Sequence, residues 1–170
     1  MQEKTGKLMK QVRLYNVIFP LWLLIMFPVP ALATLLCVLG NGLIDGLVLY
    51  FGAKRQGVQM GKKRFIFTWL KVFVTGWTMD FLVALALVLI SIVLPYELAS
   101  AIQFDAFSHW GAFVIVTCAT ALTGCLIYLV NLKLSFRKLD ASIKQKKKMA
   151  LYMAVWTAPY LFYLPTIWFY

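Results

Sequence analysis

Acidic residues are scarce in this chain of 170 residues, which has six Asp and Glu against 17 Lys and Arg, and a single His. Charged residues make up only 14% of the sequence and hydrophobic residues 62%. A soluble domain has about 25% charged and about 45–50% apolar residues. The apolar residues here form runs close to the length that crosses a bilayer. The composition therefore excludes a soluble catalytic domain and predicts a polytopic membrane protein.

The sequence also lacks the short motifs of catalytic and cofactor sites. It contains no GxSxG, HExxH, Walker loop or paired-His motif, so we predict no enzymatic activity, no catalytic residue and no cofactor. Cys37, Cys118 and Cys125 lie within apolar runs without a CxxC pair; we expect small packing side chains, not a metal site or a disulfide. Asp105 and His109 stand four residues apart, and we expect this isolated pair to have no functional role.

The basic residues are confined to three stretches of the sequence. By the positive-inside rule these stretches mark the cytoplasmic side, where they are expected to contact anionic lipid head groups. No aromatic or glycine pattern of an RNA-binding module accompanies them, so we predict no nucleic-acid partner. The stretches are Lys4, Lys7, Lys10 and Arg13; Lys54, Arg55, Lys62, Lys63, Arg64 and Lys71; and Lys133, Arg137, Lys138, Lys144, Lys146, Lys147 and Lys148.

With all basic stretches on one side, the chain is predicted to form an all-α membrane bundle with five passes. The loop of residues 96–109 has no Lys or Arg and is then external, as is the C-terminus, while the N-terminus is cytoplasmic. The expected location is a bacterial cytoplasmic membrane. A basic lead of residues 1–13 precedes a single membrane domain, residues 14–170, with spans at about 14–29, 31–52, 72–94, 111–132 and 149–170.

The first of these spans is short. Leu14 to Phe27 makes about 21 Å of helix, less than the hydrocarbon core of about 30 Å, and prolines interrupt this region. Basic stretches flank residues 14–53 on both sides, so the region must cross the membrane an even number of times. A helical hairpin with a Pro-kinked first span and its turn at Pro28-Val29-Pro30 meets this condition. The alternative is four spans plus a re-entrant first segment.

Five polar residues form the candidate ion- or substrate-binding site. Asp45 and Asp80 each lie eight residues, or about 12 Å, from the cytoplasmic end of their spans. Thr123 and Thr157 reach nearly the same depth in two other spans, and Asn41 lies one turn from Asp45. The spacing thus places polar side chains from four helices in one layer of the bilayer.

No Lys or Arg lies at the depth of these two carboxylates. The nearest, Lys71, is about 13 Å from Asp80 along the helix. A carboxylate in hydrocarbon requires a proton, a shared proton, a bound cation or water. All of these states except simple protonation are typical of an ion pathway. The alternative is that Asp45 and Asp80 are protonated or partly hydrated groups that hydrogen-bond neighbouring helices.

The glycines around Asp45 and an aromatic stripe near the C-terminus each allow two interpretations. Gly42 and Gly46 form a small-xxx-small pair, which favours close helix packing; alternatively, Gly40-Asn41-Gly42 is an unwound point that exposes carbonyls to an ion. The aromatic stripe indicates packing, or the wall of a cavity that can accept a cation. It consists of Tyr152, Trp156, Tyr160 and Tyr163.

The sequence therefore leads to two functional hypotheses. The first is a cation or proton channel or transporter, expected to be a homo-oligomer, with Asp45 and Asp80 as ion-binding carboxylates. The alternative is a non-catalytic membrane subunit or scaffold that docks a partner protein through its basic cytoplasmic loops.

Overall fold

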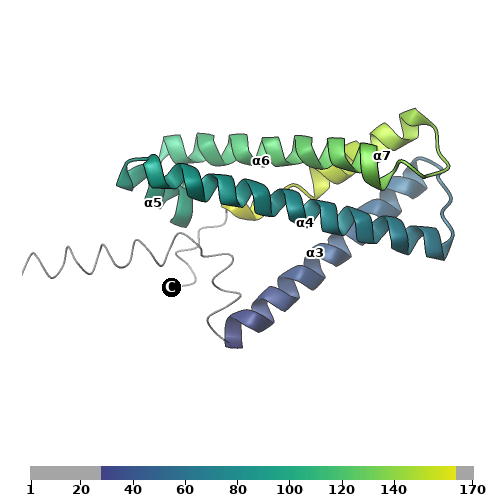
Figure 1. Ribbon diagram of the computed structural model, residues 1–170, viewed down its shortest axis with the longest axis horizontal. Coiled ribbons are helices and arrows are strands. Elements are labelled where there is room, and N and C mark those ends of the chain that lie inside the picture. The colour runs from purple at the N-terminus through teal and green to yellow at the C-terminus, as the bar shows by residue number, and fades with distance from the viewer. Residues whose placement is uncertain (1–27, 164–170) are drawn as a thin grey trace, which may run out of the picture.

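The computed structural model describes residues 28–163, with side chains from Leu39 onward except that of Leu161 (Figure 1). This part of the chain is helical and contains no strand, so the predicted all-α class is confirmed. Most of the predicted first span, 14–29, lies outside the described residues, as do residues 164–170. The main helices are α3 (Pro28–Arg55), α4 (Lys62–Val93), α5 (Tyr96–Phe104), α6 (Trp110–Val130) and α7 (Ile143–Trp156); the short elements are η1 (Ala106–Ser108), the π-helical turn η2 (Asn131–Ser135) and η3 (Tyr160–Tyr163).

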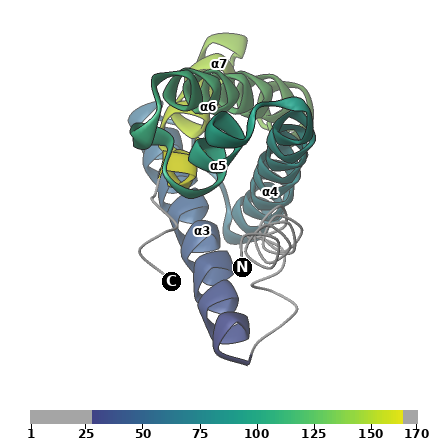
Figure 2. The ribbon, with the colours of Figure 1, turned by 90° about the vertical axis from the view of Figure 1, so that its left-hand side faces the viewer.

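Helices α4 and α6 lie side by side along the molecule, connected at one end by α5 and η1 (Figure 1). Helix α7 packs against α6 and α3, and α3 also contacts α4. The N-terminal half of α3 diverges from these helices, as both views show (Figures 1 and 2). The contacts of α3 with the bundle are therefore concentrated in its C-terminal half.

Two of the described helices are long and apolar enough to cross a membrane. Helix α4 has 32 residues and α6 with η2 has 26, which correspond to about 48 Å and about 39 Å. In the most apolar 18-residue segment of each helix, only 11% of the residues of α4 and 28% of the residues of α6 with η2 are buried. The core helix of a soluble protein buries its apolar residues, so the exposed apolar surfaces of α4 and α6 suit contact with lipid.

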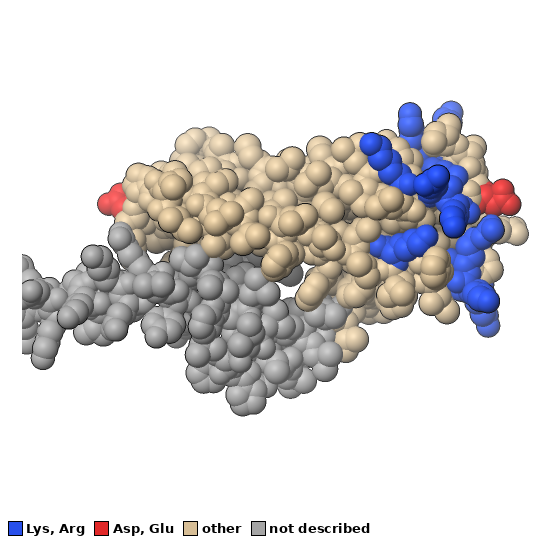
Figure 3. Space-filling view, viewed as in Figure 1, with Lys and Arg blue, Asp and Glu red and all other residues tan. Residues whose placement is uncertain are grey.

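The Lys and Arg residues of the described chain gather at one end of the molecule (Figure 3). This basic end comprises the C-terminus of α3, the first ten residues of α4, the segment from η2 to Ser142, and the first half of α7. Gln145 Nε2 on α7 donates a 2.8 Å hydrogen bond to the Gln56 carbonyl after α3. The two internal basic stretches therefore lie on the same side of the bundle, as the predicted membrane topology requires.

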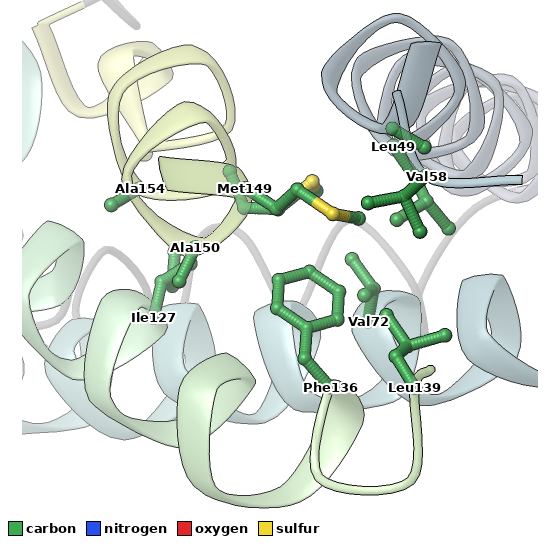
Figure 4. Packing of buried hydrophobic residues seen from close by; sticks show 11 residues of the cluster. Leu49, Val58, Val72, Ile127, Phe136, Leu139, Met149, Ala150 and Ala154 are labelled. Atoms are coloured by element: carbon green, nitrogen blue, oxygen red, sulfur yellow. The ribbon is translucent and has the colours of Figure 1, made fainter. Parts of the chain in front are cut away.

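The hydrophobic core also lies at the basic end. Phe136, in the loop after η2, is fully buried and points towards α7, beside Val72 of α4 (Figure 4). Met149 of α7 and Leu49 of α3 complete the contact between the helices, each only 1% exposed. This core fixes α3, α4 and α7 relative to one another, and so positions the polar residues that lie deeper in the bundle.

Several helix boundaries differ from the predicted ones. Pro28-Val29-Pro30 begins α3, so the predicted turn at these residues is wrong; proline is tolerated in a first helical turn, whose N–H groups have no intrahelical acceptor. Helix α4 begins at Lys62, ten residues before the predicted Val72. Residues 65–71, with the sequence FIFTWLK, are helical and continue directly into the predicted span. The predicted span 111–132 agrees closely with α6 and η2.

The last predicted span, 149–170, differs at both ends of α7. The helix begins at Ile143, because Ser142 and Gln145 form a capping box. It ends at Trp156, three residues before Pro159, which has no N–H to continue the helix. The chain then continues through η3, where the Tyr163 hydroxyl donates a 2.9 Å hydrogen bond to Thr117 Oγ1 near the start of α6. The segment thus runs from the basic end towards the opposite end of the bundle as an interrupted helix.

Candidate functional site

The glycine face of α3 packs on Trp69 of α4. A Cβ at Gly46 would lie 3.2 Å from Trp69 Nε1, and a Cβ at Gly42 would lie 3.5 Å from the rings of Trp69 and Phe73. The indole Nε1 donates a 2.7 Å hydrogen bond to the Gly42 carbonyl. The close-packing interpretation of these glycines is therefore confirmed. Residues 40–42 are part of a continuous helix, so the interpretation as an unwound ion-binding point is wrong.

The same face of α3 directs Asp45 towards α4. Asp45 is only 7% exposed. Its Oδ2 would be 3.8 Å from a Cβ at Gly76, so the missing side chain of Gly76 leaves room for the carboxylate. Asp80 lies one turn beyond Gly76 on the same face of α4. The structure thus places the two predicted carboxylates within about one helical turn of each other along α4.

The Asp45–Asp80 pair has an unsatisfied oxygen. Asp80 Oδ1 is buried and has no hydrogen-bond partner in the described part of the protein. Every described Lys and Arg belongs to the basic end, and Lys71, the nearest along α4, is about 13 Å from Asp80. No group of three or more His, Cys, Asp or Glu within residues 28–163 could hold a metal ion. Two neighbouring carboxylates in an apolar environment without a cation require a proton each, a shared proton, a bound monovalent cation or water.

The other three predicted site residues are not joined to this pair by a hydrogen bond between described residues. Thr123 is fully buried on α6 but donates to the Ala119 carbonyl of its own helix. Thr157 is the C-cap residue that follows α7, and its hydroxyl donates to the Met153 carbonyl. Asn41 lies on α3, half-buried, one turn before Asp45. The common depth of these residues therefore does not by itself make them one site.

A second buried polar cluster, between α4 and η2, was missed by sequence reasoning. Asn131 and Ser135 are 0% and 3% exposed, and neither Asn131 Nδ2 nor Ser135 Oγ has a hydrogen-bond partner among the described residues. Thr75 Oγ1 lies 3.4 Å from Asn131 Oδ1. The only sequence signal was the four-residue spacing of Asn131 and Ser135, and Lys133 between them suggested a solvated chain end.

The location of this Thr75–Asn131–Ser135 cluster relates it to the carboxylates. Thr75 precedes Asp80 by five residues, about 7.5 Å along α4 towards the basic end. The π-helical turn is closed by the Phe136 N–H, which donates to the Asn131 carbonyl. Such π-turns are frequent at functional sites. No hydrogen bond among the described residues joins this cluster to the carboxylates, and five residues of helix turn Thr75 and Asp80 to different faces of α4.

Three further predictions concern residues outside these clusters. Cys118 and Cys125 are free and exposed on α6, so neither is a packing side chain within the described bundle. The side chain of Cys37 lies outside the described residues.

Asp105 and His109 cap helices: Asp105 accepts from Phe107 N, and His109 Nδ1 accepts from the first turn of α6. In the aromatic stripe, Tyr152 lies under the Arg55 guanidinium.

No protein family, no characterised protein and no solved structure matches this chain. Its function is therefore inferred from the chemistry of the buried groups. Two adjacent carboxylates far from any cation can hold and release a proton or a small cation. The polar cluster beside them can hold water, because its unpaired donors and acceptors supply hydrogen-bond partners.

Proposed function

We propose that this chain is an integral membrane protein that conducts or transports a cation or a proton, with Asp45 and Asp80 as the ion-binding carboxylates. The observation that carries this proposal is the neighbouring pair of Asp45, which is buried against α4, and Asp80, which is half-buried with its Oδ1 unpaired among the described residues. An uncompensated carboxylate is costly in an apolar environment. A proton or cation shared by the pair removes that cost, and its exchange is the elementary step of transport.

The Thr75–Asn131–Ser135 cluster supplies the route between this pair and the basic end. Its amide and hydroxyl groups are buried and two of them are unpaired. Such groups hold ordered water, and a water-bearing route lets an ion or proton reach Asp80 from the basic end. Asn41, Thr123 and Thr157 are then secondary members of the pathway.

The proposed setting is a bacterial cytoplasmic membrane, with the basic end and the N-terminus on the cytoplasmic side and the C-terminus outside. The chain crosses the membrane five times as a homo-oligomer, has no enzymatic activity and uses no cofactor. The asymmetric distribution of Lys and Arg supports this orientation. The exposed apolar surfaces of α4 and α6 support the membrane location.

A second candidate function is a non-catalytic membrane subunit that docks a partner through its basic loops. The observation in its favour is the dense cationic surface formed by two loops that meet at one end (Figure 3). A surface of this kind attracts an acidic partner as readily as a membrane. On this alternative the buried carboxylates stabilise helix packing and have no transport role.

Purification in a mild detergent followed by reconstitution separates the two functions. If the first proposal is correct, the protein purifies as a homo-oligomer. It then moves protons or monovalent cations into liposomes whose membrane potential is negative inside. Co-purification of a different protein in fixed stoichiometry, together with silent liposomes, would support the subunit function instead. Empty liposomes and liposomes with a heat-unfolded sample of the same protein set the background leak.

A further inference from the structure

An open groove runs along the bundle between α3 and α7, away from the carboxylate pair. Its volume is about 570 Å³. Leu47 and Phe51 of α3 and Trp156 of α7 form its apolar walls, and Lys54 and Arg55 stand at its basic end. From Leu47 to Lys54 the groove extends about 10 Å along α3. It is thus an apolar trough that ends in two cations.

The packing of α3 on α7 positions Arg55 at this end of the groove. The Arg55 guanidinium lies 5.8 Å from the centre of the Tyr152 ring, a distance at which a cation is attracted to an aromatic face. The Tyr152 side chain also approaches Gly52, where a Cβ would lie 3.8 Å from Tyr152 Cβ. The hydrogen bond from Gln145 to the Gln56 carbonyl holds the same two helices just beyond the groove.

We propose that this groove binds one anionic phospholipid, with the lipid phosphate on Lys54 and Arg55 and an acyl chain along Leu47, Phe51 and Trp156. The chemistry of both parts of the groove matches this ligand. Cations at a membrane surface attract anionic head groups, and the apolar walls remove hydrocarbon from contact with water or head groups. The boundary between cations and apolar walls matches the boundary between a lipid head group and its chains.

Charge complementarity selects a lipid over other occupants of the groove. Residues 1–27 contain one acidic residue, Glu3, and residues 164–170 contain none, so the rest of the chain offers little to pair with two cations. A second copy of this chain presents mainly Lys and Arg at its basic end, with Asp140 as the acidic residue in that part of the described chain. A phospholipid supplies both the negative charge and the hydrocarbon.

Native mass spectrometry of the purified full-length protein, titrated with phosphatidylglycerol or with phosphatidylcholine of the same chain length, tests this site. We expect one saturable phosphatidylglycerol per chain and much weaker binding of phosphatidylcholine. The double variant Lys54→Gln/Arg55→Gln should weaken phosphatidylglycerol binding about thirtyfold, the effect of removing two cations near a charged lipid surface. Inorganic phosphate should not compete, because it gains nothing from the apolar walls.

Two further variants distinguish the groove from general surface charge. Lys62→Gln/Lys63→Gln removes the same charge from the same end of the molecule, at exposed positions outside the groove, and should change binding less than threefold. Trp156→Ser removes an apolar wall at an exposed side chain and should weaken binding while both cations remain. An equal loss for the two double variants, or no loss for Trp156→Ser, would overturn the groove site.

A photo-crosslinking residue at Phe51 identifies the occupant directly. Crosslinks to phosphatidylglycerol in vesicles are the expected result. Crosslinks to residues 1–27 or to a second copy of the chain would overturn the proposal. None of these measurements involves ion movement, so the lipid site and the proposed transport function succeed or fail separately.

Discussion

Gly40 and Gly46 of α3 are both helical, but they meet different surroundings. A Cβ at Gly46 would lie 3.2 Å from Trp69 Nε1, whereas nothing lies within 4 Å of a Cβ at Gly40. Gly46→Ala should therefore displace the indole and lower the free energy of unfolding by about 1 kcal/mol, the typical value of the hydrogen bond at risk. Gly40→Ala should raise it by up to about 1 kcal/mol through helix propensity.

Circular dichroism during denaturant unfolding in detergent micelles measures this difference. In a background in which the other five tryptophans are replaced by Phe, the Trp69 fluorescence spectrum provides a local check, since only the Gly46 variant should alter it. Equal stability of the two variants would contradict the close packing of α3 on Trp69.

Asn131 provides a functional prediction at the residue scale. Its Nδ2 is buried without a partner in the described chain, and Thr75 Oγ1, which donates to its Oδ1 at 3.4 Å, can still donate to the Lys71 carbonyl. Asn131→Leu should therefore leave stability nearly unchanged. If the Thr75–Asn131–Ser135 cluster carries water to Asp80, the same change should reduce ion flux about tenfold or more. Flux assays in liposomes measure the effect.

A matched control for Asn131→Leu is available on α6, the helix that precedes η2. Thr120→Val replaces a buried polar side chain whose hydroxyl donates to the Val116 carbonyl in its own helix. This control should retain wild-type flux. Wild-type flux in the Asn131 variant would exclude the cluster from the pathway.

At the scale of elements, α7 shows how a side chain can substitute for a missing backbone donor. Pro159 lacks the N–H that would bond the Val155 carbonyl four residues earlier. The Tyr160 hydroxyl donates to this carbonyl at 2.6 Å instead. Tyr160→Phe should therefore lower the free energy of unfolding by about 1 kcal/mol.

The dependence on Pro159 makes this prediction specific. In a Pro159→Ala background the backbone N–H is restored, so the cost of Tyr160→Phe should fall to nearly zero. A double-mutant cycle measured by denaturant unfolding gives this coupling directly. The same cost in both backgrounds would show that the hydroxyl does not replace the proline N–H.

The accuracy of the predicted elements followed the kind of signal each segment carried. Helix α6 was predicted well, because its apolar run is bounded by His109 and by Lys133. The start of α4 was missed, because Lys62 and its basic neighbours resemble a loop although nothing in them stops a helix. The end of α7 was also missed, because the predicted span continued through Pro159, whereas the helix ends three residues before this proline.

The candidate site was predictable only in part. The depth of Asp45 and Asp80 follows from their distance to the basic ends of their helices, and the structure places Asp45 against Gly76, one turn from Asp80 on α4. The Thr75–Asn131–Ser135 cluster depends on which face of α4 meets α6 and on a π-helical turn. Neither feature has a signature in residue spacing, because both are set by the packing of one helix on another.

At the scale of the whole molecule, the orientation in the membrane is the main prediction. Single cysteines replace the exposed residues Gln59, Ser108 and Lys147 in a background without the three native cysteines. Only the cysteine at position 108 should react with a membrane-impermeant reagent in intact cells, because the other two lie at the basic end. All three should react after the membrane is permeabilised.

Labelling at positions 59 and 147 but not at 108 would reverse the proposed orientation. Labelling at 59 without 147 would contradict the shared location of the two basic loops, which the hydrogen bond between Gln145 and Gln56 requires. A cysteine that stays unreactive after permeabilisation would show that its site is covered.

The central claim is that the Asp45–Asp80 pair binds and releases the transported ion. Ion flux into liposomes that contain the Asp→Asn variants tests this claim most directly. The amide keeps the size and hydrogen bonding of the carboxyl group but cannot titrate. We predict that Asp45→Asn and Asp80→Asn each abolish flux in a protein that remains folded and oligomeric, while Asp140→Asn, at an exposed site, retains it. Wild-type flux in both variants would contradict the claim. A loss of assembly limited to the Asp→Leu variants, from a missing interhelical hydrogen bond of roughly 0.6–2 kcal/mol, would then assign the pair to helix packing.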